Sequence, residues 1–210
     1  MEQKKINEII KILNKEYGDV DIALKFSNVF ELLVATILSA QCTDKRVNIV
    51  TSTLFKKYKT IKDYANANQK EFENDIKSTG FYRNKAKNII ATANIIIDKF
   101  NGIVPKTMDE LITLKGVARK TANIVLGSGY GIYVGIAVDT HVIRLTNLIG
   151  LSKNSDPKKI EQDLIKIIPK KYWNNISFTI QTLGRQVCIA RRSKCPVCPI
   201  KHLCNHYKSL

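Results

Sequence analysis

Apolar residues recur at helical spacing along much of the chain. Near the start they stand at positions 6, 9, 10, 13 and 17, which is one face of a helix, and Gly18 follows them. A second apolar stripe over residues 89–100 ends at Asn101-Gly102, with Pro105 beyond it. The sequence has no alternating apolar and polar runs separated by hairpin dipeptides. The pattern therefore predicts an all-α fold of about ten helices.

Capping signals predict where several of these helices begin. Asn28 with Glu31 resembles a capping box that opens the apolar segment 29–40, and Thr107 with Glu110 resembles a second one. Asp156 precedes a proline, which is the pattern of an N-cap followed by proline at the first helical position.

The charge is strongly positive and unevenly placed. The 210 residues include 34 Lys+Arg against 18 Asp+Glu, a formal charge of +16, and Asp163 is the last acidic residue. Such a surface attracts polyanions, which include DNA, RNA and acidic membranes; general solubility is the alternative. With 44% hydrophobic residues the chain is no disordered polycation. No run of 18 apolar residues and no apolar N-terminal segment occur, so we expect neither a membrane span nor a secretory signal.

Four of the five cysteines fall within the last 23 residues, with the spacing C-x6-C-x2-C-x5-C. This distribution favours a metal site in a reducing cytosol over disulfides. Four thiolates suit either tetrahedral zinc or an iron–sulfur cluster. Structural zinc sites usually have two close cysteine pairs, and here only one pair is close, so the spacing favours a [4Fe-4S] cluster. The ligands would be Cys188, Cys195, Cys198 and Cys204. Cys42 is separate, and we interpret it as a buried small residue.

The segment LKGVARKTANIVLG, residues 114–127, reads as a helix end, a turn at Gly116 and a new helix from about Ala118. It is similar to a helix-hairpin-helix motif, whose usual turn has a proline and two glycines. Lys115 and Ala118 replace the proline and the second glycine. A helix opening offers unpaired backbone N–H groups to phosphate, and Lys115 adds charge. An ordinary helix corner is the alternative.

Two residues, one just after this turn and one about twenty residues further on, carry candidate chemistry. Lys120 follows Arg119 in the first turn of the new helix, and a neutral lysine amine is a nucleophile. A phosphate contact is the alternative role. Asp139 opens the segment VDTHVIRL, where a carboxylate suits stabilisation of a cationic sugar transition state and proton transfer. A plain N-cap is the alternative for Asp139.

Taken together, the hairpin, the Lys-Thr-Ala after it, the Val-Asp-Thr-His and the cysteine spacing resemble the endonuclease III family. Its members are DNA glycosylases and abasic-site lyases of base excision repair. The resemblance extends from ELLVATILSAQCTD, residues 31–44, to Cys204. It implies a six-helix barrel over 22–133 with the helix-hairpin-helix at about 108–127. Residues 1–21 with 134–210 would form an iron–sulfur cluster domain, and DNA would lie in the cleft between the two.

The resemblance also implies roles for individual residues. Lys120 would attack C1′ of the damaged nucleotide, Asp139 would be the catalytic carboxylate, and the four cysteines would hold a [4Fe-4S] cluster. Gln41 would fill the space left by the extruded base, and Phe81 would be a wedge against the opposite strand, where the family usually has leucine. The alternatives are a helix-terminal polar residue for Gln41 and core packing for Phe81. The predicted DNA-binding set is Gln41, Phe81, Lys115, Gly116, Ala118, Arg119, His141 and Arg191.

The function that follows is removal of damaged, mainly oxidised, pyrimidines from double-stranded DNA and cleavage of abasic sites by β-elimination. The alternatives are a monofunctional or mismatch-specific glycosylase, which typically lacks the lysine at 120, and a non-catalytic DNA-binding iron–sulfur protein. A ferredoxin-like carrier fits the positive charge poorly. We expect a monomer with no membrane contact that acts in the cytoplasm, associated with the nucleoid.

Overall fold

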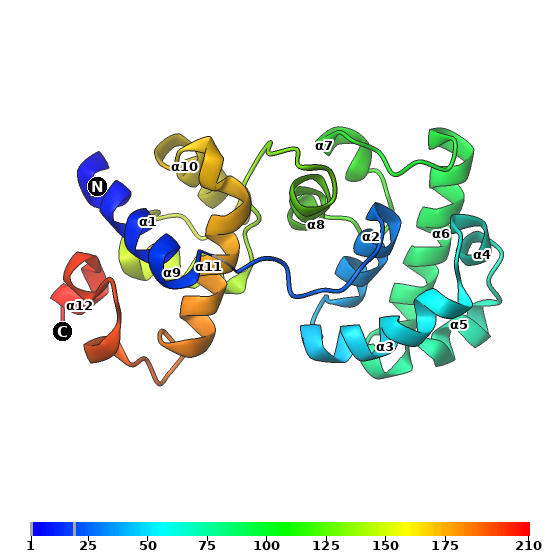
Figure 1. Cartoon of the computed structure of the whole chain (residues 1–210), viewed down its shortest axis with the longest axis horizontal. Helices are drawn as coiled ribbons and strands as arrows, with labels where there is room; N and C mark the ends of the chain where they lie inside the picture. Colours follow the sequence, from blue (N-terminus) through cyan, green and yellow to red (C-terminus); the bar gives the residue numbers. More distant parts are fainter. Residues whose placement is uncertain (1, 19) are drawn as a thin grey trace. The chain divides into compact units, whose positions relative to one another are not determined.

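The computed structural model describes residues 2–18 and 20–210. Within these ranges the chain forms helices and loops and contains no strand, so the all-α prediction is confirmed (Figure 1). Residues 1 and 19, which fall in the predicted segment 1–21, lie outside the described residues. No described helix has the length and apolar character needed to cross a membrane.

The chain divides into two compact units. Unit 1 comprises Met1–Ile22 with Gly135–Leu210, and unit 2 comprises Ala23–Val134. The helices of unit 2 are α2 (Val29–Leu38), α3 (Asp44–Lys57), α4 (Ile61–Ala65), α5 (Gln69–Asp75), η1 (Lys77–Thr79), α6 (Tyr82–Phe100), α7 (Met108–Leu111), α8 (Arg119–Ile124) and the π-helical turn η2 (Val125–Gly129). Those of unit 1 are α1 (Gln3–Tyr17), α9 (Thr140–Ile149), α10 (Pro157–Ile167), η3 (Lys170–Tyr172), α11 (Trp173–Gln186), η4 (Cys195–Val197), η5 (Lys201–Leu203) and α12 (Asn205–Lys208).

Three helices begin at the capping residues that the sequence predicted. The Asn28 side chain accepts a hydrogen bond from the Glu31 backbone N–H at 2.9 Å, which starts α2. The Glu31 carboxylate accepts from the Ser27 N–H, one residue before the cap, so the second half of the predicted box is displaced. Thr107 caps α7 and Asp156 caps α10 in the same way.

Helix α2 lies at the centre of unit 2, because eight of its ten residues are buried and it packs against α3, α6, α8 and η2. Four aromatic rings, from Phe30, Tyr58, Tyr64 and Phe72, form a cluster with centroid separations of 5.1 to 5.8 Å, mostly edge to face. Burying such large side chains removes apolar surface from water, which is the main stabilising contribution to a core. The short helices α4 and α5 are held by packing against α6.

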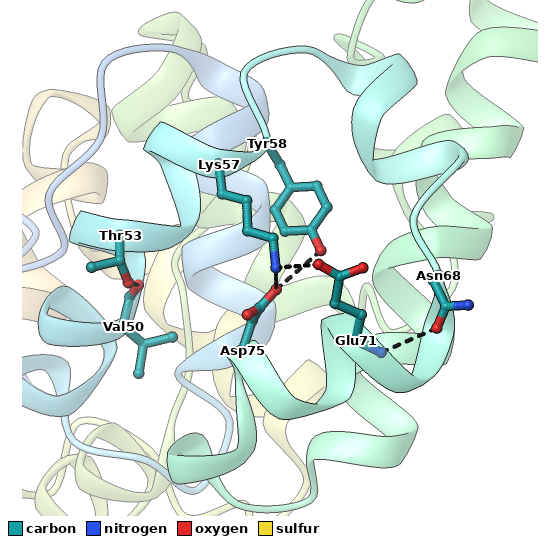
Figure 2. Close-up of polar contacts among 7 residues, drawn as sticks. All are labelled: Val50, Thr53, Lys57, Tyr58, Asn68, Glu71 and Asp75. Carbon is teal, nitrogen blue, oxygen red and sulfur yellow. Dashed lines mark hydrogen bonds and ion pairs between the residues drawn. The ribbon is translucent and has the colours of Figure 1, made fainter.

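A polar cluster at the surface joins the end of α3 to α5 (Figure 2). The Lys57 ammonium lies 2.6 Å from Asp75 and 2.7 Å from Glu71, and the Tyr58 hydroxyl donates to Asp75 at 3.0 Å. The two carboxylates hold the pKa of Lys57 above its usual range. The Asn68 side chain caps α5 beside them. Because Lys57 and Glu71 are largely solvent-exposed, this cluster is a modest tie between two helices.

Unit 1 is built around α11, which packs against α1 and α9. The apolar stripe of α1 predicted from the sequence is the stripe that is buried, at Ile6, Ile9, Ile10 and Leu13. This stripe joins a continuous core with the apolar residues of α9, α10, α11 and the cysteine segment, residues 188–204. Residues from the beginning and the end of the chain therefore share one core.

Candidate functional site

The predicted helix-hairpin-helix is formed by α7 and α8, which pack against each other. The turn exposes Lys115, Gly116 and Ala118, while Leu114 and Val117 beside them are buried. The Thr92 hydroxyl of α6 donates to the Lys115 carbonyl at 2.9 Å and thereby ties the turn to α6. Buried apolar residues therefore hold the turn in place, while the exposed residues between them leave its backbone N–H groups open to a phosphate.

Only one turn position needs glycine for its backbone conformation. Gly116 has φ +77°, in the left-handed region, and a Cβ there would lie 2.9 Å from the Asn88 Nδ2 and 3.1 Å from the Asn88 Cβ. Ala118, which replaces the second glycine of the usual motif, has φ −93° and ψ 170° and begins α8 as its N-cap. The substitution therefore leaves the backbone path of the turn unstrained.

Alanine at Gly116 is expected to lower the free energy of unfolding more than alanine at Gly102. Both glycines have a positive φ, 77° and 74°, so both substitutions add about 1 to 2 kcal/mol of backbone strain. The added Cβ meets Asn88 at Gly116 but meets nothing within 4 Å at Gly102. The difference between Gly116→Ala and Gly102→Ala should be about 1 kcal/mol or more, measured by urea unfolding. Equal losses would mean that Asn88 does not restrict the turn.

The structure places the two predicted catalytic residues at the starts of helices. Lys120 is the second residue of α8 in unit 2, and its side chain is half-buried. Asp139, in unit 1, is the N-cap of α9, and its Oδ1 accepts from the Val142 N–H at 2.9 Å. The N-cap role is confirmed, and it uses one carboxylate oxygen. The catalytic roles of both residues stay predictions.

Gln41 and Phe81 share an unusual backbone. Their φ angles are 52° and 48°, a region that residues with side chains rarely adopt, and both side chains are exposed. Phe81 is 62% exposed, so the core-packing alternative is wrong for it. Strained, exposed, non-glycine residues of this kind occur preferentially at functional sites. Both lie in unit 2, just after α2 and just before α6.

The other predicted DNA-binding residues differ in their surroundings. Arg119 opens α8 and is half-buried, whereas Arg191, with φ 65°, is exposed in the cysteine segment. The His141 ring packs so closely against α11 that a Cβ on Gly184 would lie 2.8 Å from its Nδ1. This contact gives His141 a structural role in unit 1, and its contact with DNA stays a prediction.

The four clustered cysteines line one pocket in unit 1. Apolar residues of α9 and α11 form part of its other walls, among them Leu145, Ile149 and Leu183, and residues of η5 and α12 complete them. None of the four forms a disulfide. Burial is the main cause that raises the pKa of the Cys188 and Cys198 thiols. Cys42 belongs to unit 2, and it is half-buried, whereas the sequence analysis interpreted it as a buried residue.

Arg144 of α9 contacts this pocket and was not identified from the sequence. Its guanidinium donates to the Cys188 carbonyl at 2.6 Å and approaches the Cys188 sulfur at 3.7 Å. Arg144 lies on α9 one turn after His141, and this position beside a candidate site residue is the sequence signal that could have identified it.

The four thiols supply a donor set for a metal centre. Within residues 2–18 and 20–210, no group of three or more His, Cys, Asp or Glu side chains is already arranged to hold a metal ion. Four cysteines that line one pocket are nevertheless a donor set that suits an iron–sulfur cluster or a tetrahedral zinc ion.

Sequence reasoning also missed two buried polar residues on α6. Lys85 is 4% exposed and Thr92 is 1% exposed. Both share the face of α6 that buries Ile89 and Ile96, since positions 85, 89, 92 and 96 follow the helical repeat. A lysine in phase with an apolar stripe is the signal that could have identified Lys85.

The comparisons with known proteins agree with this geometry. A family model described as the HhH-GPD superfamily of base excision DNA repair proteins matches residues 34–170. The match places the chain in the class of helix-hairpin-helix repair proteins. Endonuclease III of Synechocystis sp. is 50% identical over 96% of this chain and 92% of its own length. Endonuclease III of Bacillus subtilis is 42% identical over the same shares. The chain belongs to the endonuclease III family.

Solved structures give the same result for the fold. A non-covalent endonuclease III–DNA complex has a TM-score of 0.94 and 43% identity, covering 100% of this chain and 98% of that one. A trapped endonuclease III–DNA covalent intermediate matches with the same values. The fold of this chain is therefore one that occurs in both a non-covalent and a covalent complex with DNA.

Proposed function

We propose that this chain is a base excision repair enzyme, a DNA glycosylase and abasic-site lyase that acts on double-stranded DNA. The observation that carries the proposal is Lys120, at the start of α8 after the hairpin turn, in a chain that matches a trapped covalent endonuclease III–DNA intermediate at a TM-score of 0.94. The positive charge of +16 supports binding to a polyanion. We further propose that the enzyme removes oxidised pyrimidines. It would act as a monomer associated with the nucleoid.

The proposed reaction begins with the Lys120 amine. Its nitrogen lone pair forms a bond to C1′ of the extruded nucleotide, and the glycosidic bond breaks with its electrons leaving on the base, which takes up a proton. The sugar ring then opens to an imine between C1′ and Lys120. Loss of a proton from C2′ and departure of the 3′ phosphate complete β-elimination. Water finally hydrolyses the imine and releases Lys120.

Asp139 supplies negative charge and a proton acceptor in this proposal. A carboxylate stabilises the positive charge that develops on the sugar as the base leaves, and it can accept a proton from the attacking amine. Gln41 and Phe81 would occupy the duplex where the nucleotide has left the stack, since both side chains are exposed on short turns. The exposed hairpin turn at Gly116 would bind the DNA backbone.

The cysteine pocket completes the proposal. Cys188, Cys195, Cys198 and Cys204 would hold a [4Fe-4S] cluster, which when bound supplies iron–thiolate bonds that cross-link the loop between α11 and α12. The arrangement of four thiols around one apolar pocket supports this assignment. The basic residues of the segment, such as Arg191, would then be held in a fixed position toward phosphate.

Borohydride trapping tests the proposed function. The chain is incubated with duplex DNA that carries one abasic site, and borohydride reduces any imine to a stable amine. We expect a covalent protein–DNA product whose mass equals the chain plus the 5′ fragment. A chain that binds this DNA with high affinity but gives no covalent product would be a non-catalytic DNA-binding protein, contrary to the proposal.

Asparagine at Asp139 should slow the reaction about 100-fold and leave the DNA dissociation constant unchanged. Asparagine caps a helix as well as aspartate does, so Asp139→Asn keeps the Val142 hydrogen bond of α9 and removes only the charge. Asp139→Ala is the matched variant that removes both, and it should also lower the melting temperature. Single-turnover rates and titration of labelled DNA make the measurement. Unchanged rates in Asp139→Asn would leave this residue as an N-cap alone.

A further inference from the structure

Lys85 is a buried cation whose hydrogen bonds both go to backbone carbonyls. Its side chain enters the interior of unit 2 from the first turn of α6, and the residue is 4% exposed. A buried charge is unfavourable unless its donors are satisfied, and a methionine would fill similar space without that penalty. Burial lowers the pKa of Lys85, as desolvation of an ammonium does. The residue is therefore better explained by what its nitrogen binds than by packing.

The two acceptors lie just before the two strained residues described above. The Lys85 Nζ donates at 2.8 Å to the carbonyl of Leu38, the last residue of α2 and three residues before Gln41. It also donates at 2.8 Å to the carbonyl of Thr79, two residues before Phe81. One nitrogen therefore joins two loops that are forty residues apart in the chain.

The backbone at these loops needs such support. Gln41 and Phe81 both have a left-handed φ that is unfavourable for residues with side chains, and strained residues persist where the surroundings hold them. The carbonyl of Leu38 is one of the last of α2, where the helix leaves carbonyls without an intrahelical partner and a cation is favourable. Lys85 satisfies this carbonyl and thereby fixes where α2 ends and the Gln41 turn begins.

Helix α6 holds the hairpin from the same face. Two turns after Lys85, the Thr92 hydroxyl donates to the Lys115 carbonyl, and Asn88 between them packs against Gly116. Three segments proposed to contact DNA are thus supported by one helix face. Thr92 acts on the hairpin and Lys85 on the other two loops, which makes Thr92 a matched comparison for Lys85.

We propose that Lys85 is a positioning residue that holds the Gln41 and Phe81 loops at a fixed spacing, so that both side chains enter the duplex together when the damaged nucleotide leaves the stack. The inference rests on the proposed function, because the roles of Gln41 and Phe81 belong to it. Lys85 itself touches neither DNA nor the reacting atoms in this assignment. Its effect should appear where base extrusion is required and disappear where it is not.

The test compares two DNA substrates with the full chain. The first is an intact duplex with one oxidised pyrimidine, from which the base must be extruded. The second is a duplex with an abasic site and no nucleotide opposite it, so that the space is already open. We expect Lys85→Met to lower base excision on the first about 100-fold, and borohydride trapping on the second by less than about threefold. Thr92→Val, which removes one buried donor from the same face, should lower both to a similar extent.

A double-mutant cycle with Phe81 separates positioning from general stability. If Lys85 acts by placing the wedge, Lys85→Met should add less than about a threefold loss to Phe81→Ala, whereas independent effects multiply. If Lys85→Met does not fold, as judged by its melting curve, Lys85→Gln, which keeps an amide donor, takes its place in the same measurements. Equal losses on both substrates, or fully multiplicative losses in the cycle, would overturn the proposal.

Amide hydrogen exchange distinguishes failure of this inference from failure of the proposed function. Lys85→Met should speed exchange in the Gln41 and Phe81 loops but not in the hairpin, and Thr92→Val should do the reverse. If the wild-type chain neither excises bases nor forms an adduct, the proposed function fails while the exchange pattern still shows whether Lys85 holds both loops. Unchanged exchange at both loops would overturn the positioning role.

Discussion

Glutamine at Lys120 is expected to abolish the covalent adduct that borohydride traps on abasic-site DNA. The amide nitrogen of glutamine has no basic lone pair and cannot form an imine, so no imine remains for borohydride to reduce. Lysine and glutamine have similar reach, and Lys120 is half-buried at the start of α8, so the helix should be little disturbed. Strand cleavage at abasic sites should fall by about 1000-fold or more, since removal of a nucleophile has effects of that size.

The matched control for this variant is Lys62→Gln. Lys62 is exposed on α4 in the same unit, and its substitution removes the same charge without touching any residue assigned to the site. Its adduct yield should equal that of the wild type. Quantitative gel shifts at fixed salt should show that Lys120→Gln still binds DNA. A trapped adduct that survives in Lys120→Gln would place the nucleophile elsewhere in the chain.

Serine at Cys198 is expected to remove the visible absorption of the cluster and to destabilise unit 1. An iron–sulfur cluster absorbs near about 400 nm through its thiolate bonds, so loss of one thiolate should abolish or strongly reduce the band. The four ligands cross-link the loop between α11 and α12, and Ile200 and Leu203 of that loop belong to the core of unit 1. Because metal binding and folding are coupled, the free energy of unfolding should fall by about 3 kcal/mol or more.

Cys42→Ser provides the matched control, since it is the same substitution in the other unit. The band and the iron content should be unchanged in this variant. Iron analysis and absorption spectra of freshly purified protein make the measurement, with unfolding followed by circular dichroism. A colourless wild-type protein that contains one zinc ion per chain would contradict the cluster assignment.

Several long helices could be predicted from the sequence because their signals are local. The stripes of α1 and α6 repeat over about three turns, and the caps at Asn28, Thr107 and Asp156 involve residues only three positions apart. The short helices α4 and α5 have five and seven residues, too few for a periodic pattern to stand out. Packing against α6 stabilises them, and that contact is not visible in the sequence.

The candidate site also has parts that local motifs predict and parts that depend on long-range contacts. Lys120, Asp139 and the cysteines lie in short motifs whose spacing carries the information. The left-handed backbone of Gln41 and Phe81 could not be predicted, because neither residue type favours it. The hydrogen bond from Lys85 to Leu38 spans 47 residues, so no local pattern encodes it. Long-range contacts of this kind set the orientation of a site that motifs can only locate.

The shared core of unit 1 has a consequence during synthesis on the ribosome. The residues of unit 2, Ala23–Val134, are contiguous and can fold as soon as they emerge. Helix α1 emerges first but must wait for α9 and α11, which at translation rates of 5 to 20 residues per second takes roughly 10 seconds or more. During that interval Ile6, Ile9, Ile10 and Leu13 have no core to join. Nascent chains should therefore expose an aggregation-prone amphipathic helix that chaperones can bind until α11 has emerged.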